Sequence, residues 1–187
     1  MKFKPARKPG GVVAELNKKE DSLPIAKAGT PELFRMKTIL VPTDFSECSL
    51  KALRYAVCFA RQFRAEIVLL FVVQPYYPVP QMGALDYAIP EANLTESASK
   101  ELESLAHREI GGEFKVQSVV RVGNAAHEIA NTAKSVGANL IILSTHGHTG
   151  LKHVFMGSTA ENVVRYAPAP VLVVREHETE FIADSLD

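Results

Sequence analysis

Several features that define other protein classes are scarce or missing in this chain of 187 residues. It has no tryptophan and only two cysteines, Cys48 and Cys58. Both cysteines fall in one predicted helix, about 15 Å apart along its axis, whereas a disulfide needs Cα atoms within roughly 7 Å of each other. Two thiols that cannot pair with each other suit a reducing compartment, so we expect a cytoplasmic protein.

Long apolar runs and an excess of charge are also missing. No apolar run approaches the roughly 20 residues that a membrane helix needs, and no secretory signal follows the basic N-terminus. The 21 basic and 21 acidic residues balance, so neither a nucleic acid nor a membrane is an expected partner. Apolar residues make up 47% of the chain, which is enough for one globular domain with a sizeable core.

The two ends of the chain differ in composition from its middle. Residues 1–35 hold eight lysines and arginines against four acidic residues, many prolines and glycines, and few large apolar residues. This composition predicts a flexible basic arm with room for a short helix over 12–19. The arm is either an unstructured extension, which the composition favours, or a docking peptide for an unknown protein partner. Residues 176–187 form an acidic tail, which leaves one domain over 36–175.

Within this domain, strand patterns alternate with helical patterns. Strands are predicted at 37–42, 66–73, 114–122, 140–143 and 171–174, and helices at 46–63, 91–110, 125–135 and 160–166. The alternation predicts an α/β fold, with a five-stranded parallel sheet, right-handed crossovers and helices on both faces. We expect the strand order 3-2-1-4-5, which places the first and fourth strands beside the crevice where such sheets bind ligands.

Two loops of the domain are candidates for binding. The loop over 74–90 holds four prolines and three tyrosines, and its length is typical of lids and binding loops. The second loop follows the fourth predicted strand and contains Gly147 and Gly157. Glycines let a backbone approach a ligand closely, and the helix that follows offers unpaired N–H groups and the positive end of its dipole. The second loop therefore predicts an anion site.

Hydroxyl side chains stand where the second loop meets its helix. Ser158 or Thr159 is expected as the helix N-cap, and Glu161 would complete a capping box with Ser158. The same hydroxyls are able to donate hydrogen bonds to phosphate oxygens. The structural alternative is a glycine loop that ends a strand and leads into a well-capped helix, with no ligand.

The spacing in this second loop resembles that of the universal stress protein family, whose nucleotide-binding members carry Gly-x2-Gly-x9-Gly-(Ser/Thr) here. Gly147, Gly157 and Ser158 match the motif, and Ser144 stands where the motif has its first glycine. The resemblance extends over residues 36–175. It implies a single Rossmann-like domain of the HUP type with the strand order given above.

The resemblance further implies a stress-response regulator that binds ATP and hydrolyses it slowly or not at all. Magnesium bridging the phosphates is compatible with this, because it needs only one or two protein ligands. Asp44 would accept hydrogen bonds from ribose or adenine, although it is also placed to stabilise a helix start through the dipole. The expected nucleotide-binding residues are Pro42, Thr43, Asp44, Val72, Leu143, Ser144, His146, Gly147, His148, Gly157, Ser158 and Thr159. The family also implies a homodimer through the apolar edge strand at 171–174.

Other functions remain open from the sequence. The same fold without a nucleotide would act as a dimeric interaction module, and Ser144 in place of a glycine keeps that alternative open. His146 and His148 have a His-x-His spacing, but no cysteine or carboxylate nearby completes a ligand set, so no protein-ligated zinc is expected. No nucleophile elbow surrounds Ser158, and the loop lacks the His-x-Gly-His type of signature of related nucleotide-transfer enzymes, so no catalytic residue is expected.

Overall fold

The computed structural model divides the chain into two units, Met1–Phe34 and Arg35–Asp187. It describes residues 2–5, 12–15, 35–74, 91–145, 156–177 and 182. In the first unit, β1 (Lys2–Pro5) pairs antiparallel with β2 (Val12–Glu15). The short helix expected over 12–19 is therefore wrong at its start, where two adjacent β-branched valines favour extended backbone.

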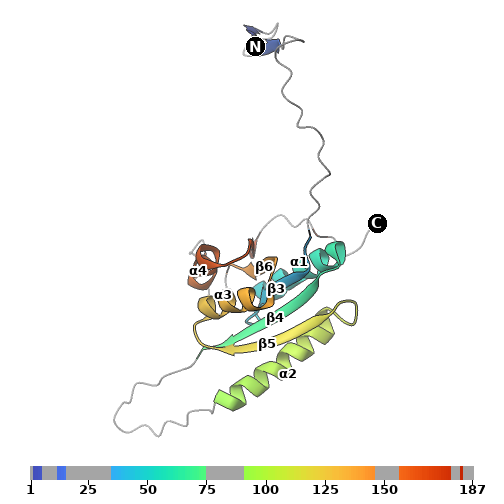
Figure 1. The fold of residues 1–187 in the computed structure, drawn as a ribbon, viewed down its shortest axis with the longest axis vertical. Helices are drawn as coiled ribbons and strands as arrows, with labels where there is room; N and C mark the ends of the chain where they lie inside the picture. The colour runs from blue at the N-terminus through green and yellow to red at the C-terminus, as the bar shows by residue number, and fades with distance from the viewer. Residues whose placement is uncertain are drawn as a thin grey trace, which may run out of the picture. The chain divides into compact units, whose positions relative to one another are not determined.

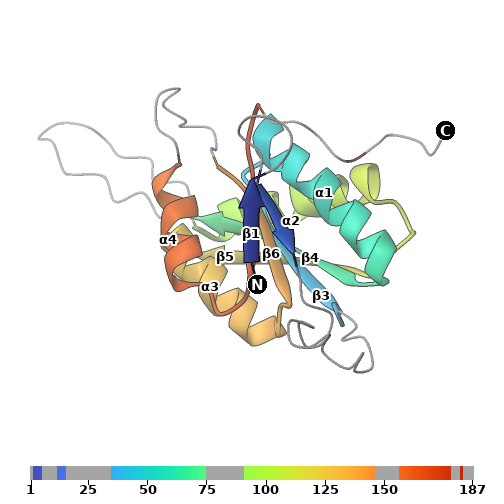
Figure 2. The same ribbon diagram turned by 90° about the horizontal axis from the view of Figure 1, so that it is seen from above.

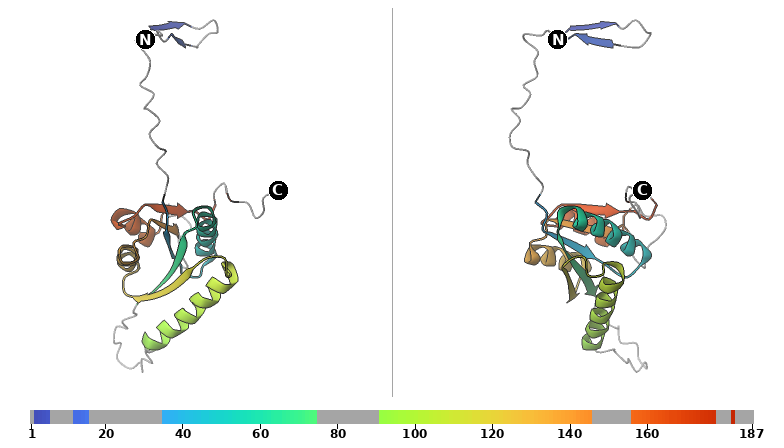
Figure 3. Two further views of the ribbon diagram at one scale, coloured as in Figure 1. Left: turned by 45° about the vertical axis from the view of Figure 1, so that its right-hand side comes forward. Right: turned by 90° about the vertical axis from the view of Figure 1, so that its right-hand side faces the viewer.

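The second unit is built on one parallel sheet of five strands (Figures 1 and 3). The strands are β3 (Thr38–Pro42), β4 (Glu66–Val73), β5 (Val116–Val122), β6 (Leu140–Ser144) and β7 (Val171–Val174). They lie in the order β5-β4-β3-β6-β7, and every neighbouring pair is parallel. The predicted order 3-2-1-4-5 is confirmed. The chain winds outward in opposite directions from β3 and β6, which lie side by side in the sheet.

Four helices cover the two faces of the sheet, as the alternating pattern predicted (Figure 2). One face carries α1 (Glu47–Phe63) and α2 (Glu91–Glu109), and the other carries α3 (Ala125–Val136) and α4 (Ser158–Tyr166). None of the helices described in the structure has both the length and the hydropathy that crossing a membrane requires.

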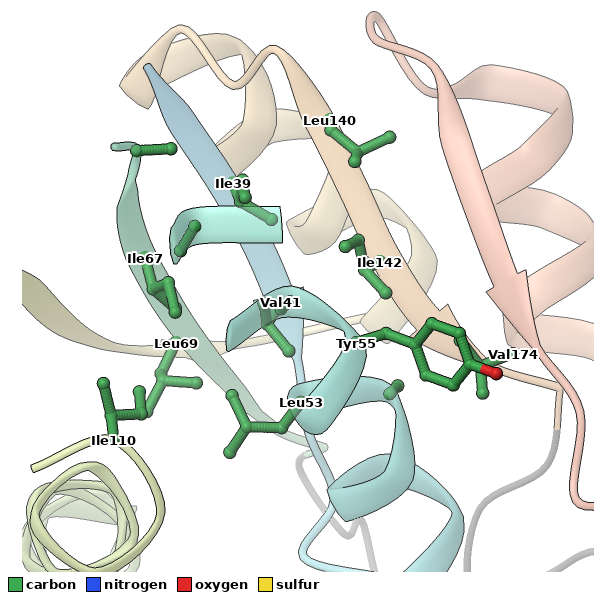
Figure 4. Packing of buried hydrophobic residues seen from close by; sticks show 14 of the residues in the cluster. Ile39, Val41, Leu53, Tyr55, Ile67, Leu69, Ile110, Leu140, Ile142 and Val174 are labelled. Atoms are coloured by element: carbon green, nitrogen blue, oxygen red, sulfur yellow. The ribbon is translucent and has the colours of Figure 1, made fainter. Parts of the chain in front are cut away.

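The core consists of two apolar layers separated by the sheet. Ile39 and Val41 of β3 belong to the layer under α1 and α2, whereas Leu40 between them belongs to the layer under α3 and α4. All three side chains are fully buried. Figure 4 shows the first layer, where Leu53 and Tyr55 of α1 lie over the sheet. Burial on both faces explains why the inner strand β3 has apolar residues on both sides, whereas the edge strand β5 includes the exposed polar residues Gln117, Ser118 and Arg121.

Local signals in the sequence account for where the helices begin and end. The side chains of Ser46 and Asn124 cap α1 and α3 by accepting hydrogen bonds from backbone N–H groups of the first turn. Helix α3 ends at Gly137, whose φ of 62° is left-handed, and α1 ends at Arg64 in the same conformation.

Candidate functional site

A hollow of 1070 Å³ lies at the carboxyl edge of the sheet. Residues that follow β3, end β4 and β6, and begin α4 all contribute to its wall. Nine of the predicted binding residues line it: Pro42, Thr43, Asp44, Val72, Leu143, Ser144, Gly157, Ser158 and Thr159. The other three, His146, Gly147 and His148, lie outside the described residues. Topology thus gathers four separate parts of the chain around one concavity, and ligand binding by these residues stays a prediction.

The turn after β3 is fixed by backbone and hydroxyl hydrogen bonds. The Thr43 N–H donates to the Leu70 carbonyl at 2.9 Å, which ties the turn to β4. The Thr43 Oγ1 lies 3.0 Å from the buried Ser49 Oγ and accepts from the Phe45 N–H at 3.0 Å. Phe45 has a left-handed φ of 64°, which is uncommon for a residue other than glycine. The turn is therefore held in one strained shape by several independent contacts.

Asp44 has a structural role in this turn as well as a place in the wall of the hollow. Its Oδ1 accepts from the Ser46 N–H at 3.1 Å and from the Ser46 hydroxyl at 2.6 Å. Ser46 is the N-cap of α1 and accepts from the Ser49 N–H at 3.2 Å. The structure supports the helix-start interpretation of Asp44, and the same contacts hold its carboxylate at the hollow.

Gly157 is required by close packing of two backbones. Its N–H donates to the Thr145 carbonyl at 2.9 Å, so this amide is engaged within the protein. A Cβ built on Gly157 would lie 2.9 Å from that same carbonyl oxygen, a separation that real Cβ atoms essentially never show. The glycine of the motif thus brings the start of α4 against the end of β6, which places the next residues at the hollow.

The N-cap of α4 differs from our expectation. Gly157 occupies that position, with φ −68° and ψ 151°, and its carbonyl accepts from the Glu161 N–H at 3.0 Å. Ser158 and Thr159 are therefore the first helical residues, and the predicted capping box is wrong. Glu161 pairs instead with Arg165 at 3.1 Å. The helix begins earlier than expected because the Thr145 contact fixes Gly157 in extended backbone, directly before the first helical residue.

This early start leaves hydrogen-bond donors at the beginning of α4. The first backbone N–H groups of a helix have no acceptor within it, and here they belong to Ser158, Thr159 and Ala160. All three residues line the hollow, and no side chain of the described residues caps the helix. The end of the helix dipole adds a positive potential on the order of half a charge. This wall of the hollow is therefore suited to an anion.

The motif position held by Ser144 does not need a glycine in this structure. Ser144 ends β6 and pairs in register with Val174, and in the described part of the chain a positive φ occurs outside glycine only at Phe45 and Arg64. Serine therefore stands there without backbone strain. The departure from the motif does not by itself disturb the path of the chain.

Helix α2 contributes a part of the wall that the sequence pattern did not reveal. Leu94, Ser97, Ala98 and Glu101 line the hollow, at the spacing of one helix face. Helical spacing predicts that Leu94 and Ala98 share an inward face; Ala98 is buried, but the prediction is wrong for Leu94, which is 39% exposed at the hollow. This face of α2 extends past the end of the sheet. Where the sheet ends depends on residues far away in the sequence, so the pattern of α2 alone does not show it.

A second hollow, of 630 Å³, lies at the opposite, amino edge of the sheet and is lined by side chains of both charges. Arg61 donates two hydrogen bonds of 2.8 Å to Glu113, and Lys115 lies 2.9 Å from Glu66. Hydrogen bonding to Arg61 lowers the pKa of Glu113, and hydrogen bonds from Lys115 and Thr38 lower the pKa of Glu66. Four of its charges thus neutralise one another in pairs, so the carboxyl-edge hollow is the better candidate. Neither hollow, nor any other place in the described residues, groups three potential metal ligands.

Comparison with known proteins is consistent with this geometry. The model of the universal stress protein family matches residues 36–175. Universal stress protein MJ0531 of Methanocaldococcus jannaschii is 33% identical over 146 residues, covering 77% of this chain and 85% of that protein. The solved structure of MJ0577 aligns with a TM-score of 0.65 and 31% identity, covering 78% of this chain and 100% of that one.

Two more distant structures of the same fold contain nucleotides. A universal stress protein in complex with cAMP aligns with a TM-score of 0.55 at 20% identity, over 75% of this chain and 98% of its own. One from Archaeoglobus fulgidus in complex with dAMP aligns with a TM-score of 0.52 at 18% identity, over 75% of this chain and 99% of its own. At these identities the likeness to our chain is one of fold.

Proposed function

Because this chain belongs to the universal stress protein family, we propose that it binds an adenine nucleotide in the hollow at the carboxyl edge of its sheet. One observation carries the proposal: nine of the twelve residues predicted from the sequence line one hollow, and the remaining three lie outside the described residues. Structural relatives with cAMP and dAMP bound indicate that this fold accommodates adenine nucleotides.

The hollow offers different chemistry to the two ends of a nucleotide. Val72 and Leu143 give apolar surface for a base, and the Asp44 carboxylate accepts hydrogen bonds from a ribose hydroxyl or an adenine amine. The hydroxyls and unpaired backbone N–H groups of Ser158 and Thr159 suit phosphate oxygens. The phosphates therefore lie at the start of α4, and the base lies beyond the ends of β3 and β4.

We extend the proposal to ATP with magnesium. The described lining carries the carboxylates of Asp44 and Glu101 and no lysine, arginine or histidine, so a polyphosphate gains from a bound cation. Magnesium prefers oxygen ligands and commonly takes only one or two from the protein. The Asp44 carboxylate and the Ser158 hydroxyl fit that requirement. Hydrolysis is slow or absent in this proposal, and the bound nucleotide serves regulation in the stress response.

The same proposal includes a homodimer through β7, the outer strand of the sheet next to β6. The carbonyls of Pro170 and Val174 accept hydrogen bonds from β6, at 3.0 and 2.9 Å. Because backbone groups alternate along a strand, those of Val171 and Val173 face the other edge. Val164 and Tyr166 of the adjacent α4 are 48% and 64% exposed. A second copy would satisfy the strand edge and cover apolar side chains.

The nucleotide proposal is tested with the full chain purified without added nucleotide. Denatured protein is assayed for released adenylates, and the nucleotide-free chain is titrated with AMP, and with ATP in the presence and absence of magnesium, by calorimetry. We expect saturable binding of AMP, and ATP binding that tightens with magnesium. Phosphate release is followed in parallel and should be slow or undetectable.

The absence of both released adenylate and binding heat would overturn the nucleotide proposal. The chain would then be a nucleotide-free dimeric interaction module, a function favoured by two features of the site. The Gly157 N–H and the Asp44 carboxylate both have partners within the protein. Rapid turnover of ATP would instead contradict the regulatory part of the proposal.

A further inference from the structure

The carboxyl-edge hollow extends across the end of the sheet to both of its faces. Val72 of β4 packs with the core layer under α3 and α4, whereas its neighbour Phe71 packs with the layer under α1 and α2. Both residues line the hollow. Its 1070 Å³ lies at the upper end of the roughly 300–1,000 Å³ of small-molecule pockets. The proposed nucleotide contacts use the β3 turn and the α3 and α4 side, so a second region remains.

We name this second region the α2 lobe. Its wall consists of Phe45, Phe71, Leu94, Ser97, Ala98 and Glu101. Helix α2 begins at the end of the sheet where β4 and β5 finish (Figure 1), which brings its first turns to the hollow. The lobe is thus built from Phe45 in the turn after β3, Phe71 near the end of β4, and one face of α2.

Two aromatic rings form the inner wall of the α2 lobe. The ring centroids of Phe45 and Phe71 lie 4.9 Å apart with an interplanar angle of 30°. Phe45 is held there by a left-handed backbone, at φ 64°, and by its N–H bond to Thr43. Backbone strain of this kind is unfavourable and persists only where the surroundings impose it. The ring is therefore fixed in place before any ligand arrives.

The charge of the α2 lobe is negative. Glu101 stands at its rim, and the ion pairs within the described part of α2 join Lys100 to Glu96 and Arg108 to Glu109. The Asp44 carboxylate lines the neighbouring part of the hollow, and no described lining residue is cationic. Aromatic faces next to carboxylates attract cations that carry apolar groups, through the ring quadrupole and through Coulomb attraction.

We propose that the α2 lobe binds an organic cation, an apolar group that carries an ammonium or quaternary ammonium charge. The apolar part lies against Phe45, Phe71 and Leu94, and the charge faces Glu101. The inference rests on the proposed function in one respect: the nucleotide is assigned to the part of the hollow outside the α2 lobe. A cation in the lobe also offsets phosphate charge, so each ligand is expected to tighten the binding of the other.

The test uses the full chain labelled with ¹⁵N and the probe benzyltrimethylammonium, followed by NMR chemical shifts. We expect saturable shifts for backbone amides of residues 94–101, and weaker shifts with the anion phenylacetate. Glu101→Gln should weaken cation binding about two- to five-fold, the size of an exposed charge interaction. Glu103→Gln is the matched control, because Glu103 is exposed on the same helix and does not line the hollow.

A second variant tests the cavity itself. Ser97→Phe, at an exposed position of α2, places a ring in the lobe and should abolish the cation shifts while the remaining amide spectrum keeps its dispersion. Equal binding of phenylacetate, equal effects of Glu101→Gln and Glu103→Gln, or no saturable shifts would each overturn the proposal. AMP is titrated into the same samples. AMP binding without cation binding overturns only the α2 lobe, and the reverse result overturns only the nucleotide proposal.

Discussion

Gly157 and Ser158 are neighbours in the chain with different physical roles at the site. Gly157 allows the backbone of α4 to approach Thr145, and its own N–H is used in that contact. Ser158 is the first residue of the helix and presents a hydroxyl and an N–H to the hollow. One residue shapes the site and the other is suited to contact the ligand, so their substitutions should have distinguishable effects.

We predict that Gly157→Ala destabilises the fold by about 1–3 kcal/mol, because the added Cβ forces two backbones apart. The effect is measured as a lower midpoint of urea unfolding. Gly112→Ala is the control, since a Cβ on Gly112 meets nothing within 4 Å. Equal midpoints for the two variants would show that the Thr145 contact does not require a glycine.

Two substitutions at Ser158 distinguish the contribution of its hydroxyl to ligand binding from that of its backbone N–H. Ser158→Ala removes the hydroxyl, and Ser158→Pro removes the N–H as well, at the first helical position where proline is tolerated. Gly157 has the extended backbone, φ −68° and ψ 151°, that a following proline requires. We predict that ATP binding falls about ten-fold more in the proline variant, since a hydrogen bond to a charged group contributes roughly 1.5–3 kcal/mol. Equal calorimetric affinities would exclude this amide as a phosphate contact.

At the scale of elements, two helices of the unit begin with the same kind of cap in different surroundings. Ser46 caps α1 and also donates to Asp44 at 2.6 Å, whereas Asn124 caps α3 through the His127 N–H at 3.1 Å. The first cap therefore connects the start of a helix to a predicted binding residue. The second cap has no such connection among the hydrogen bonds of Asn124 described here.

We predict that Ser46→Ala and Asn124→Ala each cost about 1 kcal/mol of unfolding free energy, the usual value of an N-cap. Only Ser46→Ala should also weaken AMP binding, because Asp44 loses a hydroxyl donor that orients its carboxylate. Urea unfolding and calorimetry measure the two effects. A similar loss of AMP affinity in both variants would indicate a general loosening of the fold.

Ion pairs at the amino edge connect α1 and β4 to the segment before β5. Hydrogen bonding to Arg61 lowers the pKa of Glu113, and hydrogen bonding to Lys115 lowers that of Glu66. Because the pKa of each carboxyl group is lower in the folded state, each carboxylate stabilises the fold at pH values above its ordinary pKa of 4.5. That stabilisation is lost as the pH falls through the lowered pKa.

The predicted pH effect is small, because both pairs are exposed to solvent. Between about pH 5 and pH 3, the urea midpoint of the natural protein should fall further than that of Glu113→Gln. The difference should shrink in high salt, which screens exposed charges. Glu103→Gln again serves as the control. A difference that salt leaves unchanged would argue against the Arg61 pair as its cause.

At the scale of the whole molecule, the β7 edge is where a second copy would attach. The backbone groups of Val173 face away from β6, so Val173→Pro removes an N–H from the outer edge and no bond to β6. We predict that the natural protein sediments as a dimer at micromolar concentrations and that this variant sediments as a monomer. A dimer that survives the substitution would place the interface elsewhere.

The sheet could be predicted from the sequence because each strand has a recognisable local pattern of apolar residues. Ile39 and Val41 pack on one face of the sheet and Leu40 on the other, and all three are apolar. A strand that is covered by helices on both faces requires this pattern. Asn124 and Gly137 likewise mark the ends of α3 through their own chemistry. The residues around the hollow followed from the same logic, since parallel strands must end at one edge.

Other details of the site could not be read in advance, because they depend on segments far apart in the chain. The sequence favoured Ser158 or Thr159 as the cap of α4, and the contact with Thr145 decided for Gly157. The sequence predicted a helix at 91–110, but not that Leu94 and Glu101 of this helix would line the hollow. Periodicity specifies which side of an element is buried and not where its end will lie.

By itself, the sequence determined the family, the order of the strands and the edge of the sheet at which a binding site is predicted. Those properties follow from local patterns repeated along the chain and from the geometry of parallel crossovers. Only the tertiary structure decided which residues begin α4 at the hollow and that α2 forms part of its wall. The physical reason is that hydrogen-bond partners and cavity walls are set by distances between segments, which no local pattern contains.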